Sequence, residues 1–367
     1  MKVALLAQCM YYPWNEGVKN NTLFLAKELK DKVDLEIISH KPYDEIGEDK
    51  NTKDLKINYL LSLSDNKFLQ LWYFFLDGFK VLFFMLKKGI NIISVQYLET
   101  SFLFPLFLLI LFKKNIKIIL TLYSTDELRI GYKKIFLKLF KNKFKKIIII
   151  SQYLRDEVRT LGFKDEDIEY IPLSYDKQRY CHLADFEKRN KKTILFSAGI
   201  RKEAGSFFMV DLAKIMPDYH FIFTLRQFNK KSEDELSLLM SYIEQKKVKN
   251  IEIRRNILNM EEILGEVGCL VLPLQDIHIK MLIPVALLEA MARGTICFVS
   301  DLPNLKLLVN DEQNAVIFQR DNILDLKNKI IRYIVNSSIG KSAHLFGKNF
   351  IDYPTIAQKY FYLFQAL

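Results

Sequence analysis

Apolar runs and helical stripes alternate along the chain. The first apolar run, VALLA (3–7), ends in a polar loop, and TLFLAKELK (22–30) then has helical spacing. Further strands of the first half are predicted at 35–39, 90–96, 116–123 and 146–151, with apolar helices at 68–88 and 102–112 and a basic helix before the last strand. Continuous Val, Ile and Leu strands between helices are typical of a parallel sheet that is covered on both faces.

The same alternation starts again near Lys192. Strands are predicted at 193–199, 219–225, 250–255, 269–274 and 295–300, and helices at 206–216, 231–247, 260–267 and 284–292. The interval 171–192 between the two series is polar and has no period, and the tail 353–367 has the pattern of an amphipathic helix.

We therefore predict an α/β protein with two Rossmann-like, doubly wound parallel-sheet domains that face a central cleft. Ligands bind at the carboxyl ends of the strands in such sheets. The predicted parts are a first domain at 1–175, a hinge and linker at 176–192, a second domain at 193–350 and a last helix at 351–367.

Composition agrees with two ordinary domains. The chain has 367 residues, half of them hydrophobic, which suffices for two cores. The four cysteines are far apart and predict reduced thiols of a cytosolic protein, and the five scattered histidines predict no metal site. We expect no signal peptide, and the apolar run 102–112 is shorter than the roughly 20 residues that span a bilayer.

Positive charge is concentrated in one window. The net charge is +11, and residues 113–146 hold eleven basic and two acidic residues. Within it, KKIFLKLFKNKFKK (133–146) interleaves Phe and Leu with Lys. Three explanations remain open: a solvated helix face, contact with an anionic membrane surface, or nucleic acid. Because no nucleic-acid motif accompanies the charge, we expect no nucleic-acid partner.

One stretch carries a family resemblance. IPVALLEAMARGTICFVSDLP (283–303) resembles the signature of the retaining GT-B glycosyltransferases of family 4. The positions in register are Pro284, Leu287–Met291, Gly294, Ser300 and Asp301. Weaker similarity at 120–128, 148–176 and 195–207 extends the resemblance over the chain. It implies a GT-B fold, a last helix that crosses back to the first domain, a nucleoside-diphosphate sugar as co-substrate, and no cofactor.

Arg201 and Lys202 are the candidate phosphate ligands. Glycosyl transfer leaves negative charge on the departing diphosphate, and a cationic pair just before a helix N-terminus suits two phosphates. Gly199 and Gly205 on either side allow close backbone approach. The alternative is a surface loop with two solvated charges. With Glu289, these two cations form the predicted catalytic set.

Glu289 resembles the family residue that binds the ribose hydroxyls. The alternative is an i, i+4 ion pair with Arg293 on the same helix. Lys280 adds a cation before this helix, and Pro284 suits its first turn. The nucleobase contacts are predicted after strand 250–255, at Arg254, Arg255 or Asn256.

The acceptor side is predicted in the first domain. In the loop MYYPWNEGVKNN (10–21), Gly17, with Asn15 beside it, resembles the family glycine near the sugar phosphate or the acceptor, although a plain glycine turn is the alternative. Tyr123, Ser124, Thr125 and Asp126 follow a predicted strand and are expected to line the acceptor side of the cleft.

The sequence departs from the family pattern where the sugar would bind. Met281 stands where the first of two glutamates eight apart is expected, and Tyr123 stands where the family has a histidine. The hinge motif has Leu173 and Ser174, and Leu307 replaces a further glutamate. Two interpretations follow: an enzyme with a different donor sugar or reacting centre, or a catalytically weakened partner subunit.

We expect a glycosyltransferase that acts on a hydroxyl of a glycan or lipid-linked acceptor in bacterial surface polysaccharide synthesis. Its expected location is the cytoplasm, peripheral on the inner membrane face. A nucleotide-sugar epimerase or a phosphorylase of the same fold is the alternative enzyme. Few acids and histidines are available for epimerisation, and no cofactor lysine motif is present for phosphorolysis.

Overall fold

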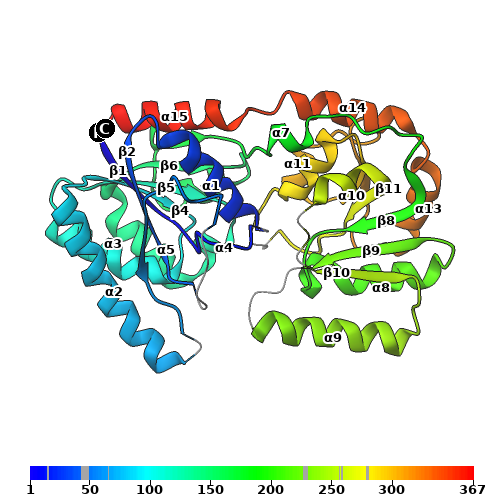
Figure 1. Cartoon of the computed structure of the whole chain (residues 1–367), viewed down its shortest axis with the longest axis horizontal. Helices are drawn as coiled ribbons and strands as arrows, with labels where there is room; N and C mark the ends of the chain where they lie inside the picture. Colours follow the sequence, from blue (N-terminus) through cyan, green and yellow to red (C-terminus); the bar gives the residue numbers. More distant parts are fainter. Residues whose placement is uncertain are drawn as a thin grey trace. The chain divides into compact units, whose positions relative to one another are not determined.

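The computed structural model divides into two compact units. The first consists of Met1–Leu173 and Tyr353–Leu367, and the second of Ser174–Asp352 (Figure 1). The structure describes residues 1–14, 16–42, 49–64, 66–225, 230–255, 257, 259–277 and 281–367.

Unit 1 contains a seven-stranded parallel sheet in the order β3-β2-β1-β4-β5-β6-β7. Its strands are β1 (Lys2–Leu6), β2 (Asp34–His40), β3 (Ile57–Leu61), β4 (Ile92–Gln96), β5 (Lys117–Leu122), β6 (Phe144–Ile149) and β7 (Ile168–Tyr170). The chain moves outward from β1 to β3 and then returns to place β4 on the other side of β1. The strand order therefore reverses between β1 and β4, which makes this point the preferred ligand position in an open sheet.

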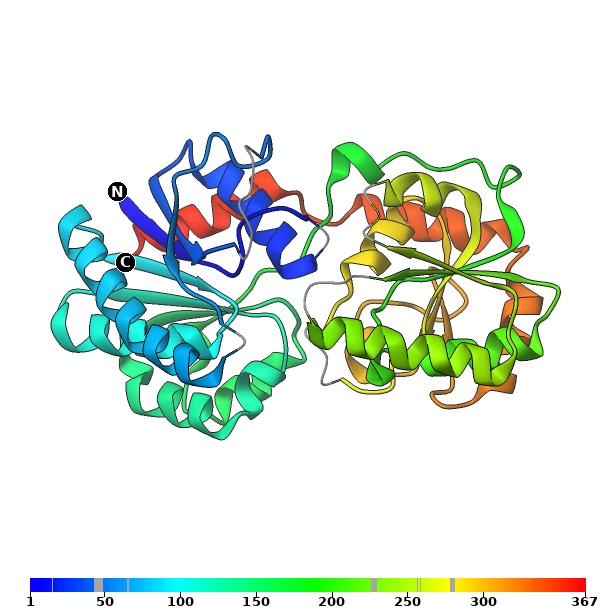
Figure 2. The ribbon, with the colours of Figure 1, turned by 60° about the horizontal axis from the view of Figure 1, so that its bottom comes forward.

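Helices cover both faces of this sheet. On one face lie α1 (Gly17–Leu29) and α15 (Tyr353–Gln365), and on the other lie α2 (Lys67–Lys88), α3 (Thr100–Phe112) and α5 (Gly131–Phe140) (Figure 2). The last helix, α15, is an integral part of unit 1. The Tyr360 hydroxyl is 2.7 Å from the Thr121 hydroxyl, and the Tyr353 ring stacks on Phe24 at 4.8 Å. Short helices complete the unit: α4 (Asp126–Arg129), η1 (Lys141–Lys143), α6 (Leu154–Arg159) and η2 (Asp165–Asp167).

The basic segment 133–146 is not one helix. Helix α5 ends at Phe140, and Phe144 already belongs to β6, where it lies opposite Ile118 and is buried. Lys133 is also buried, and its Nζ donates to the Leu98 carbonyl at 2.6 Å. Strand pairing therefore overrides the helical spacing, and only part of the segment offers its charge to solvent.

Unit 2 contains a six-stranded parallel sheet in the order β10-β9-β8-β11-β12-β13. Its strands are β8 (Asn190–Phe196), β9 (His220–Leu225), β10 (Ile251–Arg255), β11 (Val267–Leu272), β12 (Ile296–Ser300) and β13 (Val316–Phe318). Its helices are α7 (Lys177–Tyr180), η3 (Lys202–Ala204), α8 (Ser206–Ile215), α9 (Lys230–Lys246), α10 (Met260–Glu266), α11 (Val285–Ala292), α12 (Pro303–Lys306), α13 (Ile323–Tyr333) and α14 (Ser337–Lys348). Here the strand order reverses between β8 and β11.

The interval predicted as hinge and linker, 176–192, is built into unit 2. It contains α7 and the start of β8, and its Arg189 side chain is buried. The Arg189 guanidinium donates to the carbonyls of Leu264 and Arg293 at 2.5 and 2.8 Å, and burial lowers its pKa to about 10. A polar sequence without a period thus forms an ordered part of the unit, because its arginine satisfies carbonyls at the ends of other elements.

Candidate functional site

The loop between β8 and α8 lies at the strand reversal of unit 2. Gly199 and Gly205 in this loop have φ angles of 115° and 86°. A Cβ on Gly205 would lie 2.2 Å from the Pro273 carbonyl oxygen, and the Gln275 N–H donates to the Glu203 carbonyl at 2.9 Å. The loops that follow β8 and β11 are therefore in direct contact, and only glycine fits at position 205.

This loop presents positive charge and free N–H groups together. Arg201 and Lys202 are both exposed, and Gly205 caps α8 without a side-chain hydrogen bond. The Ser206 hydroxyl donates to the carbonyls of Ile200 and Arg201, so it does not cap the helix either. Two cations beside an uncapped helix N-terminus form an arrangement suited to phosphate groups.

Helix α11 begins close to the loop that follows β11. Pro284 is its N-cap residue, one position before the first helical residue, and no side chain caps this end. Asn304 donates to the Leu282 carbonyl at 2.5 Å and so fixes the entry to the helix. At the other end, Gly294 has a φ of 70° and terminates α11. A second uncapped N-terminus thus follows the same strand reversal.

Glu289 lies one turn into α11 and is half-buried. Burial and the charge of Glu289 together raise the pKa of Tyr180, which places that phenol near the carboxylate. The Arg293 guanidinium donates to the His182 carbonyl at 2.8 Å. Arg293, the partner of Glu289 in the alternative i, i+4 ion pair, therefore holds the chain at His182.

Arg320 is a third cation near this loop, and nothing in the sequence pattern predicts its position. Arg320 donates through Nη1 to the Gln275 carbonyl at 3.3 Å, and its backbone N–H donates to Asp301 at 3.0 Å. Asp301 belongs to the matched signature, but 19 residues separate it from Arg320. Only the register of β13 beside β12 brings the two together.

The predicted nucleobase contacts are only partly described. Arg254 lies in β10 and pairs with Glu252, with 2.6 Å between Nε and Oε1. Hydrogen bonds from Arg254 and His220 lower the pKa of Glu252 to about 2. Arg254 is therefore held along its own strand, whereas Arg255 is exposed at the strand end. Asn256, Lys280 and Asn15 lie outside the described residues.

In unit 1, Tyr123 lies in the interior, which differs from the predicted position on the acceptor side. Its ring is fully buried, and its hydroxyl accepts from Asn21 at 2.7 Å and donates to Gln96 at 3.0 Å. Burial keeps its pKa well above the usual value. Gly17 is the buried first residue of α1, and Asp126 is the half-exposed first residue of α4.

Ser124 and Thr125, which were also expected on the acceptor side, are buried as well. The adjacent Glu127 holds the ends of β4 and β5 together. Its buried carboxylate accepts from the backbone N–H groups of Leu98 and Tyr123 at 2.6 Å each and of Ser124 at 3.0 Å. Burial raises the pKa of Glu127 to about 7.

Replacement of Glu127 by glutamine is expected to change the pH dependence of stability. The folded pKa of about 7 lies above the unfolded value of 4.5, so the stabilising contribution is full below pH 4.5 and is lost as the pH rises through 7. The quantity to compare is the free energy of unfolding of the wild type minus that of Glu127→Gln. This difference should fall by up to about 3 kcal/mol between acidic and mildly alkaline buffer. Urea unfolding at both pH values measures this difference, and an unchanged difference would contradict the assignment.

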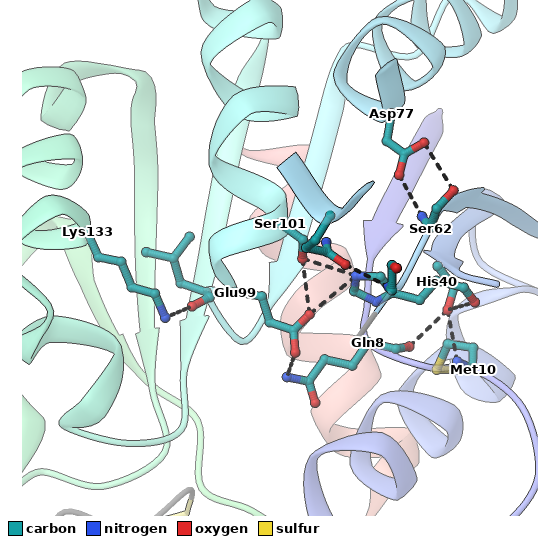
Figure 3. A network of polar contacts seen from close by, with 12 residues as sticks. Gln8, Met10, His40, Ser62, Asp77, Glu99, Ser101 and Lys133 are labelled. Carbon is teal, nitrogen blue, oxygen red and sulfur yellow. Dashed lines mark hydrogen bonds and ion pairs between the residues drawn. The ribbon is translucent and has the colours of Figure 1, made fainter. Parts of the chain in front are cut away.

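The reversal point of the unit 1 sheet carries a polar network from three adjacent strands. Gln8 follows β1, His40 ends β2, and Glu99 follows β4 (Figure 3). The Gln8 amide donates to the Glu99 carboxylate, whose second oxygen lies 3.6 Å from Nε2 of His40. The Ser101 hydroxyl joins both, at 3.0 Å from His40 and 3.3 Å from Glu99.

Glu99 is the accessible member of this network. Its side chain is 28% exposed, compared with 1% for His40. Burial lowers the pKa of His40, which favours the neutral imidazole. Two residues before Glu99, Tyr97 has a φ of 73°, which is unusual for a residue with a side chain. These residues were missed from the sequence, although Gln8 and His40 directly follow predicted strands and Glu99 lies three residues after one.

Two family models match successive parts of the chain. The model described as Glycosyltransferase Family 4 matches residues 16–179, and the model described as Glycosyl transferases group 1 matches residues 184–351. The chain belongs to the GT-B glycosyltransferases of the family 4 type. The predicted family is therefore confirmed, and the chain is a glycosyltransferase enzyme.

Proteins similar to this glycosyltransferase match 95% or more of its length. The uncharacterized glycosyltransferase MJ1178 of Methanocaldococcus jannaschii is 24% identical over 95% of this chain and 93% of its own. The structure of Anabaena Alr3699/HepE in complex with UDP and glucose is 13% identical, with a TM-score of 0.81 and full coverage of both chains. Sucrose-phosphate synthase (tll1590) from Thermosynechococcus elongatus is 15% identical, also with a TM-score of 0.81 and full coverage of both. The predicted GT-B class, with two parallel-sheet α/β domains, is confirmed.

Proposed function

We propose that this glycosyltransferase moves a sugar from a nucleoside-diphosphate donor to a hydroxyl of a glycan or lipid-linked acceptor, with retention and without a metal or cofactor. The observation that carries the proposal is the strand reversal of unit 2. There, Arg201 and Lys202 lie beside the uncapped N-terminus of α8, and α11 brings Glu289. The HepE structure, which shares the fold, holds UDP and glucose.

The proposed chemistry separates charge between the sugar and the diphosphate. The bond between the anomeric carbon and the diphosphate oxygen breaks, and the acceptor oxygen bonds to the same face of that carbon. The acceptor proton passes to the departing phosphate oxygen. Arg201 and Lys202 stabilise the negative charge as it develops, and Glu289 orients the nucleoside through its ribose. This route needs no separate base, so Met281 in place of a glutamate is compatible with it.

A nucleotide screen tests the proposal. The full chain is melted with UDP, GDP and ADP in turn, and donor hydrolysis is then measured with sugars of the nucleotide that stabilises it. Stabilisation by one nucleotide together with turnover supports the proposal. Stabilisation without turnover for every sugar and acceptor would instead favour a catalytically weakened partner subunit. No stabilisation by any nucleotide would overturn the phosphate assignment.

We further propose that the Gln8–His40–Glu99 network binds the acceptor. It lies at the reversal point of the unit 1 sheet, and the partly exposed Glu99 carboxylate can accept a hydrogen bond from an incoming hydroxyl. The neutral His40 and the Gln8 amide hold that carboxylate in place. The acceptor hydroxyl would thus be oriented by a residue that the family signature does not contain.

Replacement of Glu99 by glutamine is expected to reduce sugar transfer by about 10- to 100-fold, because it removes a charged hydrogen-bond acceptor. Nucleotide affinity and donor hydrolysis should stay within about twofold of wild type, since Glu99 belongs to unit 1. Asp126→Asn is the comparison at the end of the neighbouring strand. If transfer falls with Asp126→Asn and not with Glu99→Gln, the acceptor lies at the end of β5 instead.

For the cellular setting, we propose a cytoplasmic enzyme that is peripheral on the inner membrane face and acts in bacterial surface polysaccharide synthesis. The support is the basic segment 133–146, in which Lys134, Lys138, Lys141, Lys143, Lys145 and Lys146 are all partly or fully exposed. Anionic lipid attracts such lysines. A lipid-linked acceptor would be found at the same surface.

A further inference from the structure

Helix α2 is apolar on two opposite faces. One face, with Gly78, Val81, Leu82 and Met85, is buried and packs on α3. The opposite face carries a stripe at spacings of i, i+4, i+7, i+11, i+15 and i+18, which follows one side of a helix. This outer stripe consists of Phe68, Trp72, Phe75, Phe79, Phe83 and Leu86, which are between 43% and 70% exposed.

A surface helix of a globular protein normally has polar residues on its outer face. Here the outer stripe of α2 is aromatic and aliphatic over nearly the whole helix of 22 residues, a length of about 33 Å. Contiguous exposed apolar surface of this extent marks an interaction site, unlike the single apolar residues that are scattered over any protein surface.

The apolar surface continues onto α3, which lies beside α2, and onto α5, which lies beside α3 on the same face of the sheet (Figures 1 and 2). Phe104 of α3 contacts Phe75 at 4.9 Å between ring centroids, and Phe107 contacts Phe140 of α5 at 6.0 Å. The exposed apolar residues beyond α2 are Leu111 and Phe112 of α3 and Ile135 and Leu139 of α5. A layer of aromatic rings therefore joins three helices into one surface.

The charge around this surface has one sign. Segments 67–88, 100–114 and 131–146 contain thirteen lysines, of which Lys133 is buried, and a single acidic residue, Asp77. Asp77 is buried, and its carboxylate pairs with Lys80 at 2.6 Å. It also accepts from the Ser62 N–H at 2.6 Å (Figure 3). The partner of this surface must therefore offer apolar contact and negative charge together.

We propose that the outer stripe of α2, with the exposed ends of α3 and α5, lies in the plane of an anionic lipid leaflet. Acyl chains would cover the apolar residues, and lipid phosphates would meet the lysines at the rim. Trp72 and the half-exposed Tyr73 suit the boundary between headgroups and acyl chains. A second copy docked through the same face would bring lysines against lysines, which disfavours a symmetric dimer here.

The helix lies on the membrane rather than across it. Residues Phe68–Lys88 form a stretch long and apolar enough to cross a bilayer by length and composition. Spanning, however, would detach α2 from α3 and carry Asp77 with its partner Lys80 into hydrocarbon, and the bond between Asp77 and Ser62 would break. An ionised side chain at that depth is strongly unfavourable.

This inference extends the proposed membrane contact of 133–146. Only its biological purpose, access to a lipid-linked acceptor, rests on the proposed function.

The test is co-sedimentation of the full chain with vesicles of phosphatidylcholine, with and without phosphatidylglycerol. Wild type should bind the anionic vesicles in a salt-dependent manner. The variant Trp72→Ser/Phe79→Ser/Phe83→Ser should bind at least about tenfold less.

The matched control changes exposed apolar residues of unit 2. Leu238→Ser/Leu324→Ser/Ile331→Ser removes side chains that are 65%, 62% and 51% exposed, and it should bind vesicles like wild type. Melting with nucleotide, measured on every variant, separates loss of membrane binding from loss of the proposed function. Equal vesicle binding by the α2 variant and wild type would overturn the proposal, as would equal binding to neutral vesicles.

A single tryptophan reports the depth of α2. The chain has two tryptophans, so Phe79→Trp in a Trp14→Phe/Trp72→Phe background places the probe at the middle of the helix. An in-plane helix predicts quenching by lipids brominated near the headgroups. Strongest quenching by lipids brominated at the bilayer centre would indicate a spanning helix and contradict the in-plane orientation. A dimer in solution that the serine variant dissociates, without vesicle binding, would assign the surface to self-association instead.

Discussion

Replacement of both Arg201 and Lys202 by alanine is expected to weaken nucleoside-diphosphate binding by at least about 100-fold. Each charge-assisted hydrogen bond to phosphate contributes about 1.5–3 kcal/mol, and both cations are exposed beside the uncapped start of α8. Isothermal titration with the nucleotide selected by melting measures the change in Kd. The melting temperature without nucleotide should stay close to wild type, since both side chains are exposed.

The control for this variant removes the same charge elsewhere in unit 2. Lys214 is exposed in the last turn of α8, and Lys341 is exposed on α14. Lys214→Ala/Lys341→Ala should lower affinity by no more than about twofold through the loss of long-range attraction. If the two double variants weaken binding equally, net charge rather than the β8–α8 loop attracts the nucleotide, and the phosphate assignment is wrong.

Replacement of Gly205 by alanine is expected to destabilise unit 2 by about 3 kcal/mol or more. The φ of 86° is unfavourable for alanine by about 1 kcal/mol, and its Cβ would overlap the Pro273 carbonyl oxygen at 2.2 Å. The backbone fixes the position of this Cβ, and the atom that it overlaps is a backbone oxygen. The overlap can therefore be removed only if the loops after β8 and β11 separate. Thermal melting should show a decrease of about 6–12 °C, together with weaker nucleotide binding.

Gly199→Ala provides the matched comparison in the same loop. Its φ is 115°, but the nearest atom to an added Cβ is 3.9 Å away, so backbone strain is the only expected effect. Its decrease in stability should be about 1–2 kcal/mol. Equal losses for the two alanine variants would mean that the contact between Gly205 and Pro273 does not restrain the loop.

The long buried strands were predictable from the sequence, and the short ones were not. Runs such as LEIIS and CLVLPL overlap β2 and β11, because strands covered on both faces have continuous apolar sequences. Strands β3, β7 and β13 were missed. The last two have three residues each, and β3 is a half-exposed edge strand, so none has a pattern long enough to be recognised.

The grouping of the candidate phosphate ligands was also predictable, because these residues are close in sequence. Arg201, Lys202 and the glycines on either side belong to one loop. The Gln8–His40–Glu99 network joins positions up to 91 residues apart and depends on strand order, which a single sequence does not specify. Tyr123 follows a strand, like a ligand-facing residue, but its hydroxyl finds Asn21 and Gln96 inside the unit.

Helix α2 illustrates a further limit. Its sequence predicts a helix but not which side faces the sheet, since both sides are apolar and no polar face marks the solvent. Only the packing of Gly78 and Val81 towards α3 leaves the stripe with Trp72 and Phe79 outside. The basic segment 133–146 drew attention to membrane contact, while the larger apolar surface belongs to another helix.

The return of α15 to unit 1 has a consequence for synthesis. The ribosome makes Met1–Leu173 before unit 2, but Tyr360, which meets Thr121, and Tyr353, which stacks on Phe24, emerge only after unit 2. Unit 2 is continuous in sequence and can complete its core earlier. Unit 1 can therefore finish folding only after unit 2 has been made, and its α1 face stays uncovered until α15 arrives.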